Sequence, residues 1–147
     1  MFIRPTMRGK IGFLKETNDC AVRAAANATG FDYEMVHAAL RHHGRSDNKG
    51  AMTSTIAKAY AELGLKLEGV FGTSASARFD LATMRSVFGK DSVKHYAGMT
   101  LERFIRGNLK GSFVCCTNNH AFAVIDGKLI DHTPLAAGIR ITFIFRA

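Results

Sequence analysis

One cysteine of this 147-residue sequence lies where a thiol can become a nucleophile. Cys20 falls in the first turn of a helix that we predict over residues 19–29. Unpaired backbone N–H groups and the positive end of the helix dipole stabilise a thiolate at such a position. The Cys20 backbone N–H is also a donor for an oxyanion. Because many free cysteines are simply small core residues, Cys20 indicates chemistry only if a base lies beside it.

His120 is the candidate base. It follows the polar turn at residues 117–119 and opens the apolar stretch AFAVI, which places it at the mouth of a predicted strand rather than inside the core. A helical cysteine near one end of the chain and a strand histidine near the other are typical of a thiol–imidazole pair. The other histidines lack this setting. His37, His42 and His43 lie on or just after a predicted helix, where we expect them to face solvent.

The turn Asp126-Gly127 indicates which carboxylate orients His120. A two-residue hairpin at this turn would place His120 and Asp131 on the same face of the sheet as diagonal neighbours. Asp126 is six residues from His120, about 20 Å along a strand that rises about 3.3 Å per residue. We therefore predict that Asp131, not Asp126, orients the imidazole.

The elements that must position these residues follow from hydrophobic periodicity and from turn signals. We predict helices over residues 19–29, 33–42, 54–63, 81–88 and 101–106. We predict strands over residues 65–71, 112–117, 120–125, 128–131 and 140–145. Helices followed by an antiparallel sheet define the α+β class, and the length suits one domain over residues 1–147.

These pieces resemble the papain-like cysteine peptidase superfamily, above all its compact microbial members, the bacteriocin-processing (double-glycine) peptidases and the NlpC-like hydrolases. The likeness is carried by Asn18-Asp19-Cys20 before a small-residue helix, by residues 120–125 and by Asp131. It implies a papain-like fold in which the helix that bears the cysteine packs on the C-terminal sheet. It also implies Cys20 as nucleophile, His120 as general base and Asp131 as the orienting residue. The small size and tight hairpin are similar to those of phage-encoded accessory proteins.

One departure from the family concerns the oxyanion hole. The family usually places a Gln a few residues before the cysteine, and this sequence contains no Gln. Asn18 and Thr17 each carry a side-chain donor close to Cys20. We expect Asn18 to take the place of the Gln.

The charge of the chain is lopsided, with 20 Lys and Arg against 12 Asp and Glu, a net charge of +8. Such a surface favours nucleic acid, an acidic cell-wall polymer or an acidic protein partner, although here the basic residues are dispersed.

We expect a peptidase or isopeptidase that acts on a protein or peptide through a thioester acyl-enzyme. Two alternatives stay open: an amidase acting on peptidoglycan peptides, and a non-catalytic basic module that binds nucleic acid or a host protein.

No cofactor is expected. A metal site built from Cys115, Cys116, His120 and His132 would lack CxxC or HxxxH spacing, and adjacent cysteines on a strand point to opposite faces. The chain offers no disulfide framework, no apolar run near the roughly 18 residues of a membrane span and no secretory stretch at its start. We therefore expect a reduced protein of the cytoplasm, the host's if the chain is phage-encoded, without membrane contact.

The polar stretch over residues 41–51 joins two predicted helices in the half of the chain that carries Cys20. It contains glycine and is long enough to move. We expect it to border the substrate cleft and to help determine specificity, although an unconstrained surface loop has the same composition.

Overall fold

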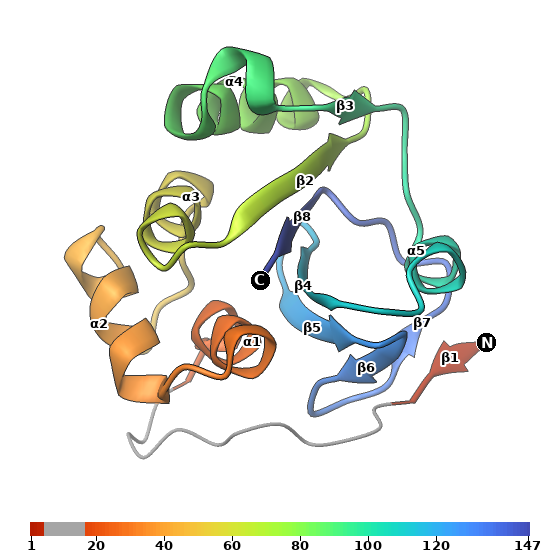
Figure 1. Ribbon diagram of the computed structural model, residues 1–147, viewed down its shortest axis with the longest axis horizontal. Coiled ribbons are helices and arrows are strands. Elements are labelled where there is room, and N and C mark those ends of the chain that lie inside the picture. Colours follow the sequence, from red (N-terminus) through yellow and green to blue (C-terminus); the bar gives the residue numbers. More distant parts are fainter. Residues whose placement is uncertain (5–16) are drawn as a thin grey trace.

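The computed structural model describes residues 1–4 and 17–147, and these form a mixed α+β architecture (Figure 1). The helices are α1 (Cys20–Thr29), α2 (Tyr33–His42), α3 (Thr53–Glu62), α4 (Ala75–Phe88), α5 (Leu101–Gly107) and the 3-10 turn Lys90–Ser92. The strands are β1 (Phe2–Ile3), β2 (Lys66–Phe71), β3 (His95–Tyr96), β4 (Ser112–Cys116), β5 (Ala121–Ile125), β6 (Lys128–Ile130), β7 (Leu135–Ala136) and β8 (Phe143–Arg146). The predicted α+β class is confirmed.

Most of the N-terminal stretch in which the sequence indicates no secretory signal lies outside the described residues. Among the helices of the described part, none has the length and apolar character needed to cross a membrane.

The main sheet has six strands in the order β3-β2-β8-β4-β5-β6. Every neighbouring pair from β2 to β6 in this order is antiparallel, but β2 and β3 run parallel. The sheet is therefore mixed, and the expectation of a wholly antiparallel sheet is wrong. The connection gives the reason, because α4 lies between β2 and β3 in the chain and a helical crossover joins parallel strands. β1 and β7 pair separately in a two-stranded sheet.

The two faces of the sheet cover two different apolar cores. On β4, Val114 and Cys116 join the core made with α1 to α4, whereas Phe113 and Cys115 join the core made with α5. Figure 1 shows α1, α2 and α3 on one side of the sheet and α5 on the other. The two adjacent cysteines thus point to opposite faces, as the two-residue period of a strand requires.

α1 is buried almost all round, as its small-residue composition predicts. Its buried residues are Ala21, Val22, Ala24, Ala25, Ala26 and Ala28. Small side chains let the helix lie close against β4 and β5. The helix ends at Gly30, whose φ of 78° is left-handed and whose N–H donates to the Ala26 carbonyl at 3.0 Å. Cys20 is thereby fixed at the start of a helix that is packed on the sheet.

Two predicted boundaries differ from the observed ones by more than one residue. α4 begins at Ala75 rather than at residue 81, because the Ser74 hydroxyl caps it and accepts the Ala77 N–H at 3.1 Å. β8 begins at Phe143 rather than at residue 140. The chain before β8 is hydrogen-bonded to the start of α5 instead. The Ile139 carbonyl accepts the Leu101 N–H at 3.0 Å, and the Ala137 carbonyl accepts the Glu102 N–H at 2.9 Å.

Candidate active site

The structure brings the three predicted residues Cys20, His120 and Asp131 together. They come from the start of α1, from the position before β5 and from the position after β6. Nε2 of His120 lies 2.7 Å from Oδ2 of Asp131, and the Cys20 thiol is hydrogen-bonded to the same imidazole. Because Nε2 is occupied by the carboxylate, Nδ1 is left for the thiol. The order is thiol, imidazole, carboxylate.

The β5–β6 hairpin has the predicted register. Residue 125 pairs with 128, 124 with 129 and 123 with 130. Asp126 and Gly127 have φ values of 51° and 75°, as a two-residue turn of the I′ type requires. The Asp126 carboxylate is used elsewhere, where its Oδ1 accepts the Gly111 N–H at 2.9 Å. Asp131, not Asp126, is therefore the carboxylate that contacts His120.

The environment of Cys20 favours its thiolate. Partial burial by itself would raise the pKa of the thiol, but hydrogen bonds from His120 and from the Ala121 backbone N–H lower it. The positive charges of His120 and Arg23 lower it further, so that the pKa of Cys20 lies below its ordinary value. The Ala121 N–H is a contact that the sequence analysis missed, since no sequence pattern brings the start of β5 to the start of α1.

His120 favours its charged form. The hydrogen bond to Asp131 is the main cause that raises the pKa of His120 to about 9, and the hydrogen bond to Cys20 adds to it against the cost of burial. Asp131 is 7% exposed, and its other oxygen accepts the His132 N–H at 2.8 Å. With both oxygens engaged, the carboxylate has one orientation, which orients the charged ring and selects the tautomer of the neutral one.

The first turn of α1 is tied to both neighbouring helices. Asp19 precedes the helix, yet its carboxylate does not cap it. The side chain is buried, where Oδ2 accepts the Tyr33 hydroxyl of α2 at 2.7 Å and Oδ1 lies 3.1 Å from Nε of Arg23. On the other side, the Tyr60 hydroxyl of α3 donates to the Ala21 carbonyl at 2.6 Å. These contacts fix the position of Cys20 relative to the helical layer.

The segment before Cys20 is held by the loop between α2 and α3. The Thr17 N–H donates to Oδ1 of Asn48 at 3.0 Å, and the Asn18 side-chain amide donates to the Asn48 carbonyl at 3.1 Å. Arg45, which is buried, donates to the Thr17 carbonyl at 3.4 Å. Asn48 was not among the residues predicted from the sequence. Its φ of 62° is left-handed, a conformation that Asn tolerates better than most residues.

A cleft of about 260 Å³ opens beside the thiol. Loop residues Gly50 and Ala51 border it on one side, and residues 117–119 border it on the other. The loop predicted over residues 41–51 thus borders the cleft beside Cys20, and its part in substrate specificity stays a prediction. Asn18 is exposed and, among the described residues, is not one of those that line the cleft.

The expectation that His37 faces solvent is wrong, since this residue is 5% exposed. It lies four positions after Tyr33, on the same face of α2, and its ring stacks on that of Tyr33 with centroids 5.9 Å apart. His42 is exposed, and the His43 side chain is 22% exposed.

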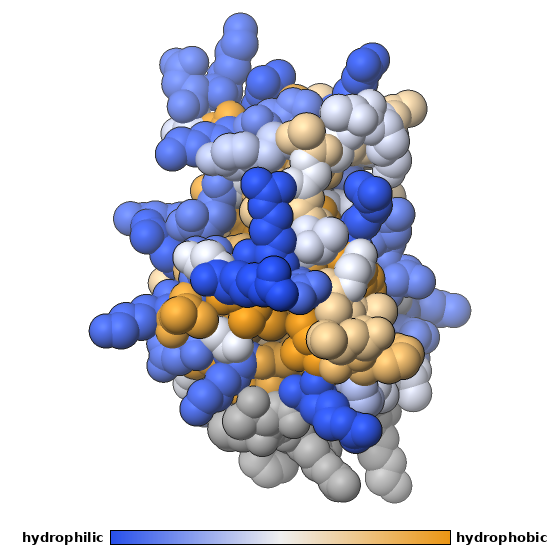
Figure 2. Space-filling model, turned by 90° about the vertical axis from the view of Figure 1, so that its right-hand side faces the viewer, coloured by the Kyte–Doolittle hydropathy of each residue, from blue (hydrophilic) through white to orange (hydrophobic). Residues whose placement is uncertain are grey.

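A larger hollow, of about 470 Å³, lies on the α5 side of the sheet. Apolar side chains such as Phe71 and Phe104 line it together with the charged Glu68 and Arg103. Figure 2 shows the α5 side of the molecule, with apolar surface among scattered hydrophilic side chains. None of the thiol, imidazole and carboxylate groups described above lines this hollow, so the smaller cleft is the candidate active site.

No protein-family model, curated protein or solved structure matches this chain. A thiolate beside an imidazolium that a carboxylate orients can attack an electrophilic carbon, and the imidazolium can then protonate the leaving group.

Proposed function

We propose that this protein is a cysteine hydrolase with a papain-like fold, a peptidase or isopeptidase that acts through a thioester acyl-enzyme. The observation that carries the proposal is the contact of His120 with both the Cys20 thiol and the Asp131 carboxylate, at the start of a buried helix. A cysteine with only a structural role has no use for a lowered pKa or for an oriented imidazole.

In the proposed reaction the Cys20 thiolate attacks the carbonyl carbon of the substrate, and the carbonyl oxygen becomes an oxyanion. The His120 imidazolium gives its proton to the leaving amine as the C–N bond breaks, which leaves a thioester on Cys20. The neutral imidazole then takes a proton from water, and the hydroxide releases the acid and regenerates the thiolate. Asp131 stabilises the imidazolium throughout by its hydrogen bond at 2.7 Å.

The oxyanion needs at least one more donor than the Cys20 backbone N–H. We propose the side-chain amide of Asn18, which does not line the cleft in this structure and would have to turn from the Asn48 carbonyl towards the thiol. Asn119 lines the cleft itself and is the competing donor. Comparing Asn18→Ala with Asn119→Ala separates the two, because loss of the true donor lowers kcat and leaves KM nearly unchanged.

The walls of the cleft favour a substrate with small residues beside the bond that is cleaved. Ala21, Gly50 and Ala51 line it next to Cys20, and its volume of about 260 Å³ leaves little room for large side chains. We therefore propose Gly or Ala on at least one side of the cleaved bond.

The experiment that tests the function begins with an electrophilic thiol probe at neutral pH, followed by mass spectrometry of the modified peptide. Modification of Cys20 ahead of the other two cysteines supports the proposal. Digestion of a peptide library by the wild type and by Cys20→Ala then identifies the substrate class, and cell-wall zymography tests the amidase alternative. A protein whose Cys20 reacts no faster than an unfolded thiol would not be a cysteine hydrolase.

A further inference from the structure

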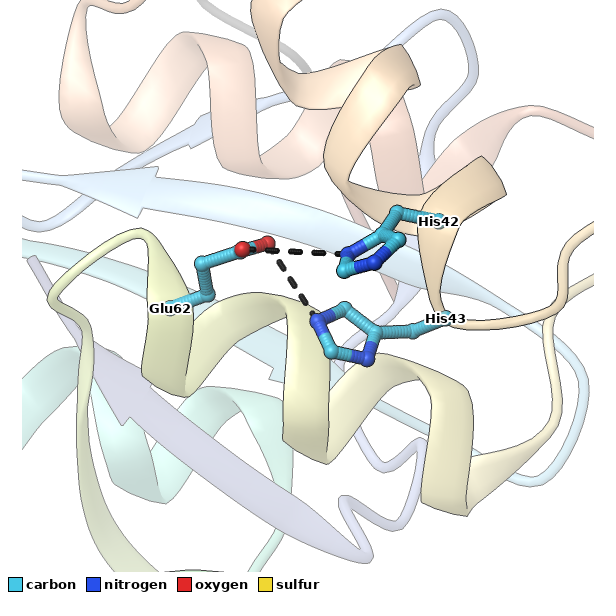
Figure 3. Close-up of side chains that lie close together, drawn as sticks. All are labelled: His42, His43 and Glu62. Carbon is cyan, nitrogen blue, oxygen red and sulfur yellow. Dashed lines mark hydrogen bonds and ion pairs between the residues drawn. The ribbon is translucent and has the colours of Figure 1, made fainter.

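A cluster of side chains that can bind a metal ion lies at the C-terminal ends of two helices. His42 closes α2, His43 follows it, and Glu62 closes α3. Nδ1 of His42 lies 3.8 Å from Oε1 of Glu62, and Nε2 of His43 lies 3.2 Å from Oε2. Figure 3 shows both rings turned towards the one carboxylate. None of these residues takes part in the proposed hydrolysis.

The spacing of the cluster is that of a metal-ion site. One nitrogen or oxygen atom from each residue can be chosen so that all three lie within 4.8 Å of one another. Zn²⁺ binds imidazole nitrogen and carboxylate oxygen at about 2.0–2.2 Å, so neighbouring ligand atoms of a tetrahedral site are about 3.3 Å apart. The two nitrogen–oxygen distances, 3.2 and 3.8 Å, end on different oxygens of Glu62, so side-chain rotation would have to bring both nitrogens and the carboxylate to one ion.

Hydrogen bonds to neighbouring residues fix the backbone of His43. The His43 N–H donates to the Ala39 carbonyl at 3.2 Å, and its carbonyl accepts the Thr55 hydroxyl of α3 at 3.0 Å. The rings of His42 and His43 lie with centroids 4.8 Å apart. An ion bound here would therefore need only side-chain rotation, most of it at His42, which is 72% exposed.

We propose that His42, His43 and Glu62 bind a divalent transition-metal ion, Zn²⁺, with water completing a tetrahedral coordination. Two neutral imidazoles and one carboxylate are ligands that zinc accepts, and three protein ligands leave one position open to solvent. The bound ion would join the C-terminal end of α2 to that of α3. The proposal is independent of the proposed hydrolase function, because it uses other residues.

The test is isothermal titration of the untagged protein with Zn²⁺, in the wild type and in Cys20→Ser. The Cys20→Ser variant is included because a thiolate beside an imidazole can itself bind zinc. We expect one equivalent of Zn²⁺ to bind to Cys20→Ser. Adding Glu62→Gln or His42→Ala to this variant should lower its Zn²⁺ affinity about tenfold or more. Loss of even a hydrogen-bond partner of a metal ligand lowers metal affinity by about 10- to 100-fold.

Glu34→Gln is the matched control, since Glu34 is an exposed carboxylate of α2 outside the cluster. It should leave the affinity unchanged. Titration with Co²⁺ gives a second readout, in which the cluster produces visible d–d bands without the charge-transfer band of a thiolate ligand. Absence of binding to Cys20→Ser, or binding that Glu62→Gln and His42→Ala leave intact, would overturn the proposal and leave a metal-free pair of His–Glu contacts.

Discussion

Oδ2 of Asp131 lies 2.7 Å from Nε2 of His120, eleven residues away across the β5–β6 hairpin. The contact depends on the register of that hairpin, because a shift by one residue would move the Asp131 side chain to the other face of the sheet. The turn at Asp126 and Gly127, both with left-handed φ, fixes this register. The orientation of the imidazole thus depends on a two-residue turn at the far end of the strands.

The first prediction compares two aspartates of the hairpin. Asp131→Asn should lower kcat/KM by about 10²-fold or more, because the imidazole loses the group that orients it and stabilises its charge. Asp126→Asn should leave the activity close to wild type, since an Asn oxygen can still accept the Gly111 N–H and Asn tolerates the φ of 51°. Steady-state kinetics on both variants, with circular dichroism to check folding, measures this. Loss of activity in Asp126→Asn alone would contradict it.

The second prediction concerns the three thiols. Cys20 should be alkylated much faster than Cys115 and Cys116 at neutral pH. Burial raises the pKa of both strand thiols well above the ordinary value, whereas the pKa of Cys20 is lowered. Timed reaction with iodoacetamide and mass spectrometry of the digest gives the three rates. His120→Ala should slow the labelling of Cys20 and leave the other two thiols unreactive. Equal rates at the three positions would show that the pair does not activate the thiol.

The third prediction is the alkaline limit of hydrolysis. The imidazolium that protonates the leaving amine is present below the pKa of His120, about 9, and is lost above it, so kcat/KM should fall as the pH rises through about 9. Asp131 is the main cause that raises this pKa. Asp131→Asn should therefore move the alkaline limb to lower pH. Profiles of kcat/KM against pH for the two proteins measure the shift, and an unmoved limb would mean that another group sets it.

A fourth prediction tests the loop that holds the segment before Cys20. Asn48→Gly keeps the left-handed backbone but removes the acceptor for the Thr17 N–H, and should lower the free energy of unfolding by about 0.5–1.5 kcal/mol. Asn48→Asp retains the oxygen and should stay near wild type. Urea unfolding measures both. If Asn48 also positions Cys20, Asn48→Gly slows thiol labelling while Asn48→Asp does not; equal labelling rates would assign Asn48 to stability alone.

The fifth prediction concerns the narrow cleft. Ala51→Phe places a ring in a cleft of about 260 Å³ and should lower kcat/KM for peptide substrates by about tenfold or more. Labelling of Cys20 by the small reagent iodoacetamide should be little changed, because the triad is untouched. The ratio of the two rates in wild type and variant is the measurement. A variant that cleaves peptides as well as the wild type would place the substrate elsewhere.

Local pattern alone was enough for much of the fold. The small-residue composition of residues 19–29 predicted a buried helix, and α1 (Cys20–Thr29) is one. The Asp126-Gly127 turn predicted the hairpin register and, through it, the contact of Asp131 with His120. These predictions succeed because helix period, strand period and turn geometry are properties of residues that are near neighbours in the chain.

Contacts between distant elements were decided only by the tertiary structure. The sequence suggested that Cys20 and His120 pair, but their contact and the lowered pKa of Cys20 depend on how α1 packs on β5. The burial of His37, and the hydrogen bonds of Asn48 to the segment before Cys20, depend in the same way on how the helices and their loops pack. The parallel pairing of β2 with β3 depends on where α4 returns the chain, which strand periodicity does not encode. Periodicity says which face of an element is apolar, whereas packing decides which element covers it.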